Sequence, residues 1–113
     1  MINQPLISII TICKNSERYI EEAIISVINQ NYQNIEYIII DGDSKDSTKE
    51  IIKKYREHIN VFISEKDNGI YHAINKGISL CQGKIIKILN SDDKLNPNAL
   101  DKIANYFQTN NLI

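Results

Sequence analysis

The chain has 113 residues, 42% of them hydrophobic, and a formal net charge of −1. This length suits one domain or part of one, and the near-neutral charge argues against nucleic acid as a general partner, because phosphate binding needs a basic surface. The start of the chain has no signal-peptide pattern, and no apolar run approaches the roughly 20 residues of a membrane helix, so we expect a cytoplasmic protein and leave open an association with the inner membrane face.

Strand-like and helix-like segments alternate along the chain. Short β-branched runs predict the strands, and apolar residues at i, i+3 and i+4 predict amphipathic helices between them. Strands are expected at 6–12, 35–40, 60–64 and from 84 onward, and helices at about 16–30, from about 47, over 70–81 and from 96–97. Because right-handed crossovers allow few arrangements, the pattern predicts a Rossmann-like α/β/α sandwich whose parallel sheet has strand order 3-2-1-4.

Two helix starts carry local capping signals. Asn15 or Ser16 is placed to cap the first helix. Ser47 with Glu50 three residues later fits a capping box for the second helix. We therefore expect these side chains to bond to the first amides of their own helices.

Acidic side chains follow three of the predicted strands. Asp92 and Asp93 stand side by side after the fourth strand, where each favours its charged form only beside a cation or donor. A divalent cation with oxygen ligands is the simplest partner, and open parallel sheets bind ligands at this edge. The acids are Asp41 and Asp43 after the second strand, Asp67 after the third, and Asp92 and Asp93 after the fourth. The sequence thus predicts a metal here, with an anion bound through it.

Competing interpretations of these acids remain. Simple turn capping is favoured for Asp43 and Asp46 and disfavoured for Asp41 and Asp93. The turn after the first strand has no glycine, which argues against a dinucleotide fold. The run that begins at Asp41 resembles the nucleophile motif of haloacid dehalogenase-like phosphatases, and this activity stays open as a minor alternative.

Four blocks in the same order resemble family 2 glycosyltransferases of the GT-A fold. One of them resembles the family's Asp-Gly-x-Ser-x-Asp-x-Thr turn, and another resembles its variant of the Asp-x-Asp metal motif. The blocks are residues 7–15 with 19–30, 37–48, 64–77 and 90–93. Together they cover nearly the whole chain, whereas each block alone would be a weak signal.

This resemblance implies transfer of a sugar from a nucleotide-diphosphate sugar, expected to be a UDP-sugar, to a glycan or lipid-linked acceptor, with inversion and with Mn²⁺ or Mg²⁺. It also implies a place for six side chains. Thr11 and Asn15 would lie along the base and ribose, Asp41 would accept a hydrogen bond from the base, Asp67 would line the nucleotide pocket, Asp92 would approach the ribose or the metal, and Asp93 would coordinate the metal.

The chain departs from the family pattern in several places. Lys14 stands near the position of an aromatic residue that often follows the first strand, and His72 stands where Asp is common. A surface histidine is at least as good an interpretation of His72 as a binding role. Glu65 and Asp67 are only loose candidates for the general base that inverting transfer needs.

Residues 1–113 are therefore expected to be the nucleotide-binding half of a truncated GT-A domain, with the general base in the absent half. A module that binds nucleotide or assembles with a partner without turnover is the alternative. An Ile-rich fourth strand with an open edge would pair with another chain, so we also expect a homodimer.

Overall fold

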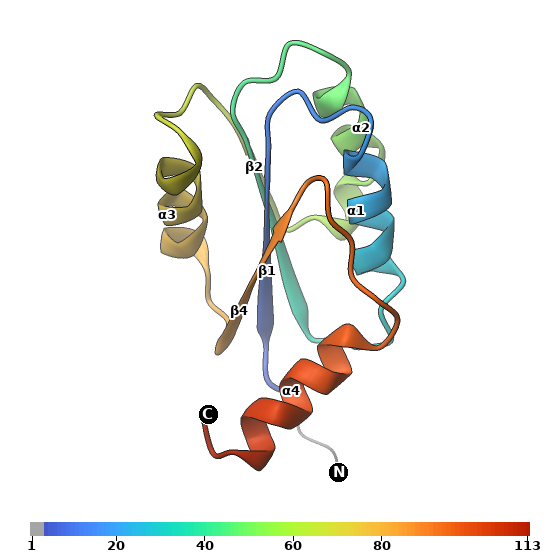
Figure 1. The fold of residues 1–113 in the computed structure, drawn as a ribbon, viewed down its shortest axis with the longest axis vertical. Helices are drawn as coiled ribbons and strands as arrows, with labels where there is room; N and C mark the ends of the chain where they lie inside the picture. Colours follow the sequence, from blue (N-terminus) through green and yellow to red (C-terminus); the bar gives the residue numbers. More distant parts are fainter. Residues whose placement is uncertain (1–3) are drawn as a thin grey trace.

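The computed structural model describes residues 4–113, which form four strands, four α-helices and one 3₁₀ turn (Figure 1). The strands are β1 (Ile7–Cys13), β2 (Ile35–Asp41), β3 (Val61–Ser64) and β4 (Ile85–Asn90). The helices are α1 (Ile20–Ile28), α2 (Thr48–Lys54), α3 (Ile70–Leu80) and α4 (Ala99–Thr109), and the 3₁₀ turn η1 (Arg56–His58) follows α2. The predicted alternation of strands and helices is confirmed.

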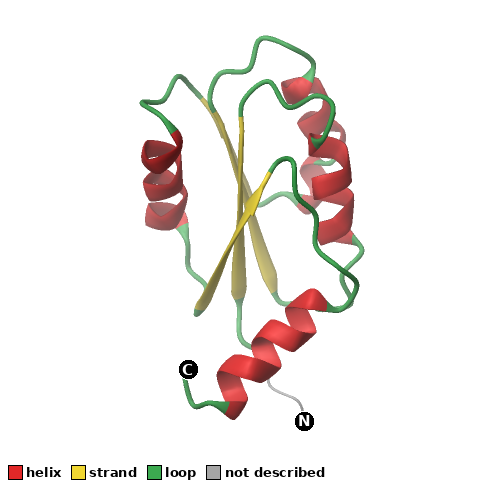
Figure 2. Cartoon of the chain, in the orientation of Figure 1, coloured by secondary structure: helices red, strands yellow, loops and turns green. Residues whose placement is uncertain are grey.

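All strand pairs of the sheet are parallel, and the order β3-β2-β1-β4 is the predicted one. The register places Cys13 opposite Asp41 and Asp41 opposite Ser64, while Ile12 lies opposite Asn90. The four strands thus end at one edge of the sheet (Figure 2). Side chains that follow different strands are brought together there.

Helices cover both faces of the sheet, which gives the three expected layers. Helices α1 and α2 lie on one face, α3 lies on the other, and α4 crosses the end of the sheet where the strands begin (Figure 1). Alternate β1 side chains serve the two faces, since Ile9 belongs to the larger core cluster and Ile10 to the smaller one. Gly77 lets α3 approach closely, because a β-carbon there would come within 2.6 Å of Ile10 Cγ2.

The face under α3 is less completely covered. Ile78 of α3 and Ile86 of the edge strand β4 are each 43% exposed. The predicted homodimer through this edge stays a prediction. Within residues 4–113, the helices are all too short or too polar to cross a bilayer.

The predicted capping interactions are wrong. Within the described chain, α1 begins at Ile20 without a side-chain cap, so neither Asn15 nor Ser16 caps it. Ser47 precedes α2 but likewise makes no capping hydrogen bond. Asp46 acts instead, since its Oδ1 accepts a hydrogen bond from the Thr48 amide at 3.0 Å.

Candidate functional site

A cavity of about 490 Å³ opens where the strands end. This volume lies in the usual range for small-molecule sites. Its polar walls include Lys14, Asn15, Ser16, Asp67, Ser91 and Asp92, and its apolar walls include Ile12, Tyr19 and Ile70. A cavity of about 560 Å³ at the opposite end of the sheet has no acidic side chain in its lining, and ligands of parallel sheets bind at the carboxyl ends of strands. We therefore take the first cavity as the candidate site.

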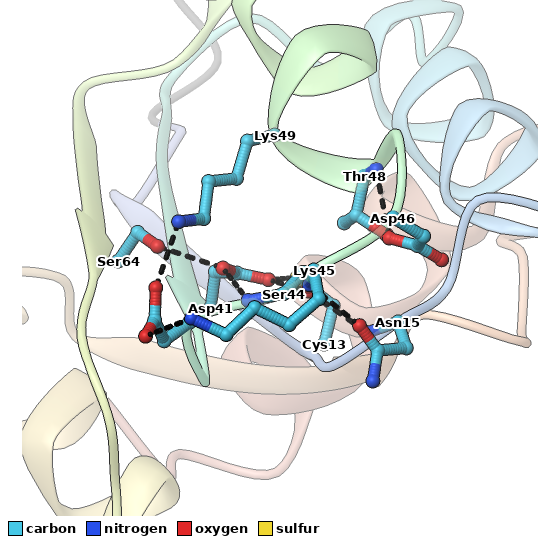
Figure 3. Close-up of polar contacts among 10 residues, drawn as sticks. Cys13, Asn15, Asp41, Ser44, Lys45, Asp46, Thr48, Lys49 and Ser64 are labelled. Carbon is cyan, nitrogen blue, oxygen red and sulfur yellow. Dashed lines mark hydrogen bonds and ion pairs between the residues drawn. The ribbon is translucent and has the colours of Figure 1, made fainter.

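The loops after β1 and β2 are tied together by hydrogen bonds between backbone and side chain. The Asn15 amide donates to Ser44 Oγ at 2.8 Å, and Asn15 Oδ1 accepts from the Lys45 amide at 2.8 Å (Figure 3). The Ser16 amide donates to Thr48 Oγ1, also at 2.8 Å. Asn15 has a left-handed backbone with φ of 51°, which asparagine tolerates better than most residues. The cavity wall next to β1 is thus held from the neighbouring loop.

Asp41 lies beneath this wall and has no exposed surface. Its carboxylate accepts hydrogen bonds from the Ser44 amide at 2.9 Å, from the Ser44 hydroxyl, and from Ser64 Oγ at 2.7 Å (Figure 3). Cys13 Sγ donates to Asp41 Oδ1 at 3.3 Å, and burial together with this carboxylate raises the pKa of the Cys13 thiol far above its ordinary value. Asp41 does not line the cavity, so it is not placed to attack a phosphate as the phosphatase alternative requires.

Two further acids of the same loop have partners within the chain, and Asp46 caps the turn as predicted, whereas Asp43 forms ion pairs instead of a cap. Asp46 Oδ1 accepts from the Thr48 amide and from Thr48 Oγ1 at 2.6 Å. Asp43 pairs with Lys49 at 2.8 Å and with Lys45 at 2.9 Å. These hydrogen bonds, first the one from Lys49, lower the pKa of Asp43 from 3.8 to about 2. Both acids therefore shape the loop.

The loop between β3 and α3 presents Asp67 to the cavity. Asp67 Oδ1 accepts from the Gly69 amide at 3.2 Å, and Gly69 has the positive φ of 105° that suits glycine. His72 Nδ1 accepts from the Asn68 amide at 3.0 Å, which supports the structural interpretation of this histidine. Asp67 Oδ2 rests over Gly42, since a β-carbon on that glycine would lie 3.0 Å from it.

The loop after β4 carries the acidic pair. Ser91 Oγ shares a 2.7 Å hydrogen bond with Ser16 Oγ, which joins this loop to the one after β1. Asp92 lines the cavity, and its carboxylate makes no hydrogen bond or ion pair within residues 4–113. Asp93 does not line the cavity, but both acids line an adjoining hollow of about 140 Å³. Asp93 Oδ1 accepts only a 3.3 Å bond from the Lys94 amide among the described residues.

The described residues contain no group of three or more acidic, histidine or cysteine side chains that could hold a metal by themselves. Two adjacent carboxylates still fit a hard cation that takes its other ligands from phosphates and water, as Mg²⁺ commonly does. Asp92 and Asp93 are the residues that would hold such a cation.

The structure separates the six predicted side chains into two groups. Asn15, Asp67 and Asp92 line the cavity, and Asp93 lines the adjoining hollow. Thr11 is fully buried beneath the site, like Asp41, and its Oγ1 lies 2.9 Å from the hydroxyl of Tyr37. The two buried side chains support the site from below.

Two residues of the site were missed by sequence reasoning. In the sequence, Lys14 was noted only as the residue near the position of a family aromatic. A lysine near several acidic loop residues is itself an indication of an anion-binding site, and Lys14 lines the cavity with Asp67 and Asp92. Ser91 stands inside the acidic motif and joins two loops, but its partner Ser16 lies 75 positions away, so no local sequence pattern could predict the contact.

Glu65, a loose candidate for the general base, pairs with Lys76 at 2.5 Å. This hydrogen bond lowers the pKa of Glu65 and makes the carboxylate a weaker base.

Comparisons with known proteins support the family resemblance of the sequence. Residues 8–113 match the sequence family described as "Glycosyl transferase family 2". An uncharacterized glycosyltransferase of Haemophilus influenzae is 35% identical over 116 residues, which cover 100% of this chain and 36% of that protein. The putative teichuronic acid biosynthesis glycosyltransferase TuaG of Bacillus subtilis is 37% identical over 102 residues, which cover 88% of this chain and 40% of that protein.

A solved structure has the same fold. Staphylococcus aureus TarS 1–349 in complex with UDP-GlcNAc gives a TM-score of 0.85 at 27% identity, over 91% of this chain and 31% of that one. The chain therefore spans well under half the length of these relatives.

Proposed function

This chain belongs to glycosyl transferase family 2, and from that premise we propose that it forms the donor-binding part of an enzyme that transfers a sugar from a nucleotide-diphosphate sugar to a glycan or lipid-linked acceptor. The observation that carries the proposal is the cavity where the strands end, with the unbonded Asp92 carboxylate at one end and Asp67 at the other. The Asp92 carboxylate and one oxygen of Asp67 are open to a ligand, whereas the buried Asp41 carboxylate is bonded to Ser44 and Ser64.

The layout of the strands supports one direction for the bound donor. Asp92 and Asp93 follow β4, and Asp67 follows β3 at the opposite side of the sheet. Three strand spacings separate these ends, or about 14 Å at the usual spacing, which is the scale of a nucleoside diphosphate. The diphosphate then lies at the acidic pair, and the nucleoside extends across β1 and β2.

Asp92 and Asp93 would hold Mn²⁺ or Mg²⁺ against the diphosphate. When bound, the cation supplies positive charge that stabilises the leaving diphosphate. The chain's own contribution is to fix the loops, because the Ser16–Ser91 hydrogen bond holds the acidic loop against the wall next to β1. Asn15 holds that wall to the loop after β2.

The donor is a UDP-sugar in this proposal, because TarS, 27% identical, is known in complex with UDP-GlcNAc. The name of TuaG points to a cell-surface polysaccharide as the product. Inverting transfer also needs a general base for the acceptor hydroxyl. We place that base in the part of the longer relatives that this chain does not cover, since Glu65 is bound to Lys76 and lies off the cavity.

Titration calorimetry of UDP into the chain, with Mn²⁺ and with a chelator, tests the proposal. We expect binding that requires the metal and that falls at least tenfold in Asp92→Asn and in Asp93→Asn. Asp43→Asn is the matched control, because this acid is bound by two lysines and lies outside the cavity. Equal UDP affinity with and without metal, or in both variants of the acidic pair, contradicts the proposal.

A module that binds nucleotide without turnover is the second candidate. The ion pair between Glu65 and Lys76 favours this candidate, because it occupies one of the two loose candidates for the general base. Asp67 and Asp92 are then the carboxylates in the described lining of the cavity. Release of UDP from UDP-sugar by the chain, measured over hours with Mn²⁺, would contradict the module. Binding without any release fits both candidates, because the general base of the first one lies outside this chain.

A further inference from the structure

A further hollow of the molecule, at the edge of the sheet, is lined by three lysines. This lysine pocket, of about 360 Å³, lies between β4, the start of α4 and the segment that joins them. The lysines are Lys87 of β4, Lys94 of the joining segment and Lys102 of α4. Asp93 is the one acidic side chain among the described residues of the lining. The pocket thus carries a surplus of positive charge, although the whole chain has a net charge of −1.

Lys87 is a half-buried cation on the apolar face of an edge strand. It lies opposite Ile9 of β1 in the register, and Ile9 belongs to the larger core cluster. Leu89, two residues further along β4, belongs to the same cluster, since alternate residues of a strand share a face. Within residues 4–113, the Lys87 ammonium has no hydrogen bond and no ion pair. Because a buried charge is costly without a counter-charge, an anion is its expected partner.

The other two lysines also have charge to offer a ligand. The Lys102 ammonium has no hydrogen bond or ion pair in the described chain. Lys94 approaches Glu22 only to 3.9 Å, and both side chains are well exposed, so water and salt screen this pair. Lys102 lies one turn after Ala99, and both residues line the pocket, whereas Asp101 does not. The positive end of the α4 dipole therefore adds to the charge of the lysines.

The wall of the lysine pocket is held in place by α1. The segment between β4 and α4 runs alongside α1 (Figure 1), and the Leu95 amide donates to Ser26 Oγ at 2.9 Å. Gln30, just after α1, bonds twice to this wall. Its Nε2 donates to the Asn96 carbonyl at 2.8 Å, and its Oε1 accepts from the Leu100 amide at 3.1 Å. The pocket is thus preformed by bonds within the chain.

The lysine pocket continues a row of hollows that starts at the candidate cavity. The candidate cavity and the hollow of about 140 Å³ share Tyr19 and Asp92, and that hollow and the lysine pocket share Asp93 and Lys94. The lysine pocket therefore lies beyond the acidic pair, on the side away from Asp67. In the proposed function the nucleoside extends across β1 and β2, so the sugar at the other end of the diphosphate lies on the side of the lysine pocket.

We propose that the lysine pocket binds a phosphate group of the acceptor, so that the acceptor is a phosphate-bearing glycan. Phosphate presents several charged oxygens and can meet Lys87, Lys94 and Lys102 together, whereas a carboxylate presents two oxygens. The volume lies at the lower end of the range for small-molecule sites, which leaves room for part of the group attached to the phosphate. The role of the acceptor rests on the proposed function, whereas phosphate binding in the pocket is independent of it.

Amide NMR of the chain without metal, titrated with inorganic phosphate, tests the pocket directly. We expect shifts that saturate together at Lys87, Lys94 and Ala99, which represent the three elements of the lining. Asp67 and its neighbours should not respond, because without a cation the acids of the candidate cavity repel phosphate. Shifts confined to the candidate cavity would overturn the proposal.

Lysine variants then measure what each charge contributes. Lys87→Met should weaken phosphate binding about tenfold, as loss of a charged hydrogen bond does, and Lys102→Met should weaken it several-fold. Lys87→Arg should retain most of the affinity, since it keeps a charged donor. Lys84→Met is the matched control, because it removes the same charge directly before β4 but outside the lining of the pocket. Its phosphate affinity should equal that of the parent chain.

Asp93→Asn provides a test with two opposite expected signs. It removes the carboxylate of the lining, so phosphate binding without metal should become several-fold tighter. The same variant should weaken the metal-dependent binding of UDP. Melting temperatures and sedimentation check that every variant is folded and does not assemble further. If Lys87→Met assembles but keeps its phosphate affinity, Lys87 only protects the edge strand from pairing, and the proposal is overturned.

Three other ligands identify the chemistry of the partner. Glycerol 3-phosphate should bind like inorganic phosphate, and acetate at equal ionic strength should not bind. Equal binding of acetate would overturn the assignment to phosphate. Binding to phosphatidylglycerol vesicles without binding of either soluble phosphate would assign the lysines to a membrane surface and would also overturn it.

The results also separate this inference from the proposed function. Metal-dependent UDP binding without lysine-dependent phosphate binding overturns the lysine pocket alone. Lysine-dependent phosphate binding without any UDP binding supports the anion site, while it overturns the proposed function and with it the role of the acceptor.

Discussion

The loops after β1 and β2 differ from the loops after β3 and β4 in what their acidic side chains do. In the first pair of loops, Asp41 and Asp46 accept hydrogen bonds from their own chain and hold the wall of the cavity. In the second pair, Asp67 keeps one oxygen unbonded within residues 4–113, and Asp92 keeps both. An acid at a strand end is therefore structural or available to a ligand according to the donors around it, and the residue type alone does not decide.

Among these predictions, Asp41→Asn should cause the largest loss of stability, because Asp41 supports the loops after β1 and β2. The amide would place a donor against Ser44 and Ser64, which already donate to this group, and the site is fully buried. Disruption of such a network costs about 2–4 kcal/mol. Urea unfolding should show this loss as a lower midpoint, whereas Asp92→Asn should leave the midpoint unchanged. A variant as stable as the parent chain would show that Asp41 is not the support of the loop.

The sequence predicted the sheet well because the relevant signals are local. Runs such as Ile35–Ile40 are β-branched and apolar, and the observed strand β2 differs from the predicted one by a single residue. The strand order followed from the handedness of crossovers and is also confirmed. Fold class and layers were therefore accessible from pattern alone.

The start of α1 was predicted wrongly because the relevant interactions are not local. The spacing of Asn15 and Ser16 fits a helix cap, but their side-chain oxygens are bonded to Lys45 and Ser91, which lie 30 and 75 positions away. Tertiary contacts thus take over the groups that local capping would use.

The roles of the site acids show the same limit. Asp41 was the favoured acid of its loop, yet it is the one without exposed surface. Its burial depends on Ser64 of β3 and Cys13 of β1, which no spacing connects to it. Which acids face the cavity could therefore not be read from the sequence.

Gly42→Ala should have a smaller effect, and it tests the contact between the loop after β2, which carries Gly42, and the loop after β3, which carries Asp67. The added β-carbon would lie 3.0 Å from Asp67 Oδ2, so the carboxylate must shift by a few tenths of an ångström. We expect a several-fold loss of UDP affinity, below about tenfold, and little change in the urea midpoint. In a double-mutant cycle with Asp67→Asn the two losses should be less than additive, since they act on one contact. Full additivity would mean that Gly42 acts on the site by another route.

The smallest effect on stability should come from protonation of Asp43, which lies in the loop after β2 and does not line the cavity. Its pKa is lowered from 3.8 to about 2, first by the hydrogen bond from Lys49 and then by the one from Lys45. The folded state thus favours the ionised carboxylate, so the stability it adds is present above pH 3.8 and is lost as the pH falls toward 2. Because these side chains are partly exposed, water and salt screen the interaction and keep the contribution small.

Carboxyl carbon shifts followed by NMR against pH check this value. The Asp43 midpoint should lie near 2 at low salt and should move toward 3.8 in the Lys45→Met/Lys49→Met variant or at 1 M salt. UDP affinity should not change in that variant, because neither lysine lines the cavity. If UDP binding weakened there, the charges of the first region would reach the ligand, and the division between supporting and ligand-facing loops would have to be withdrawn.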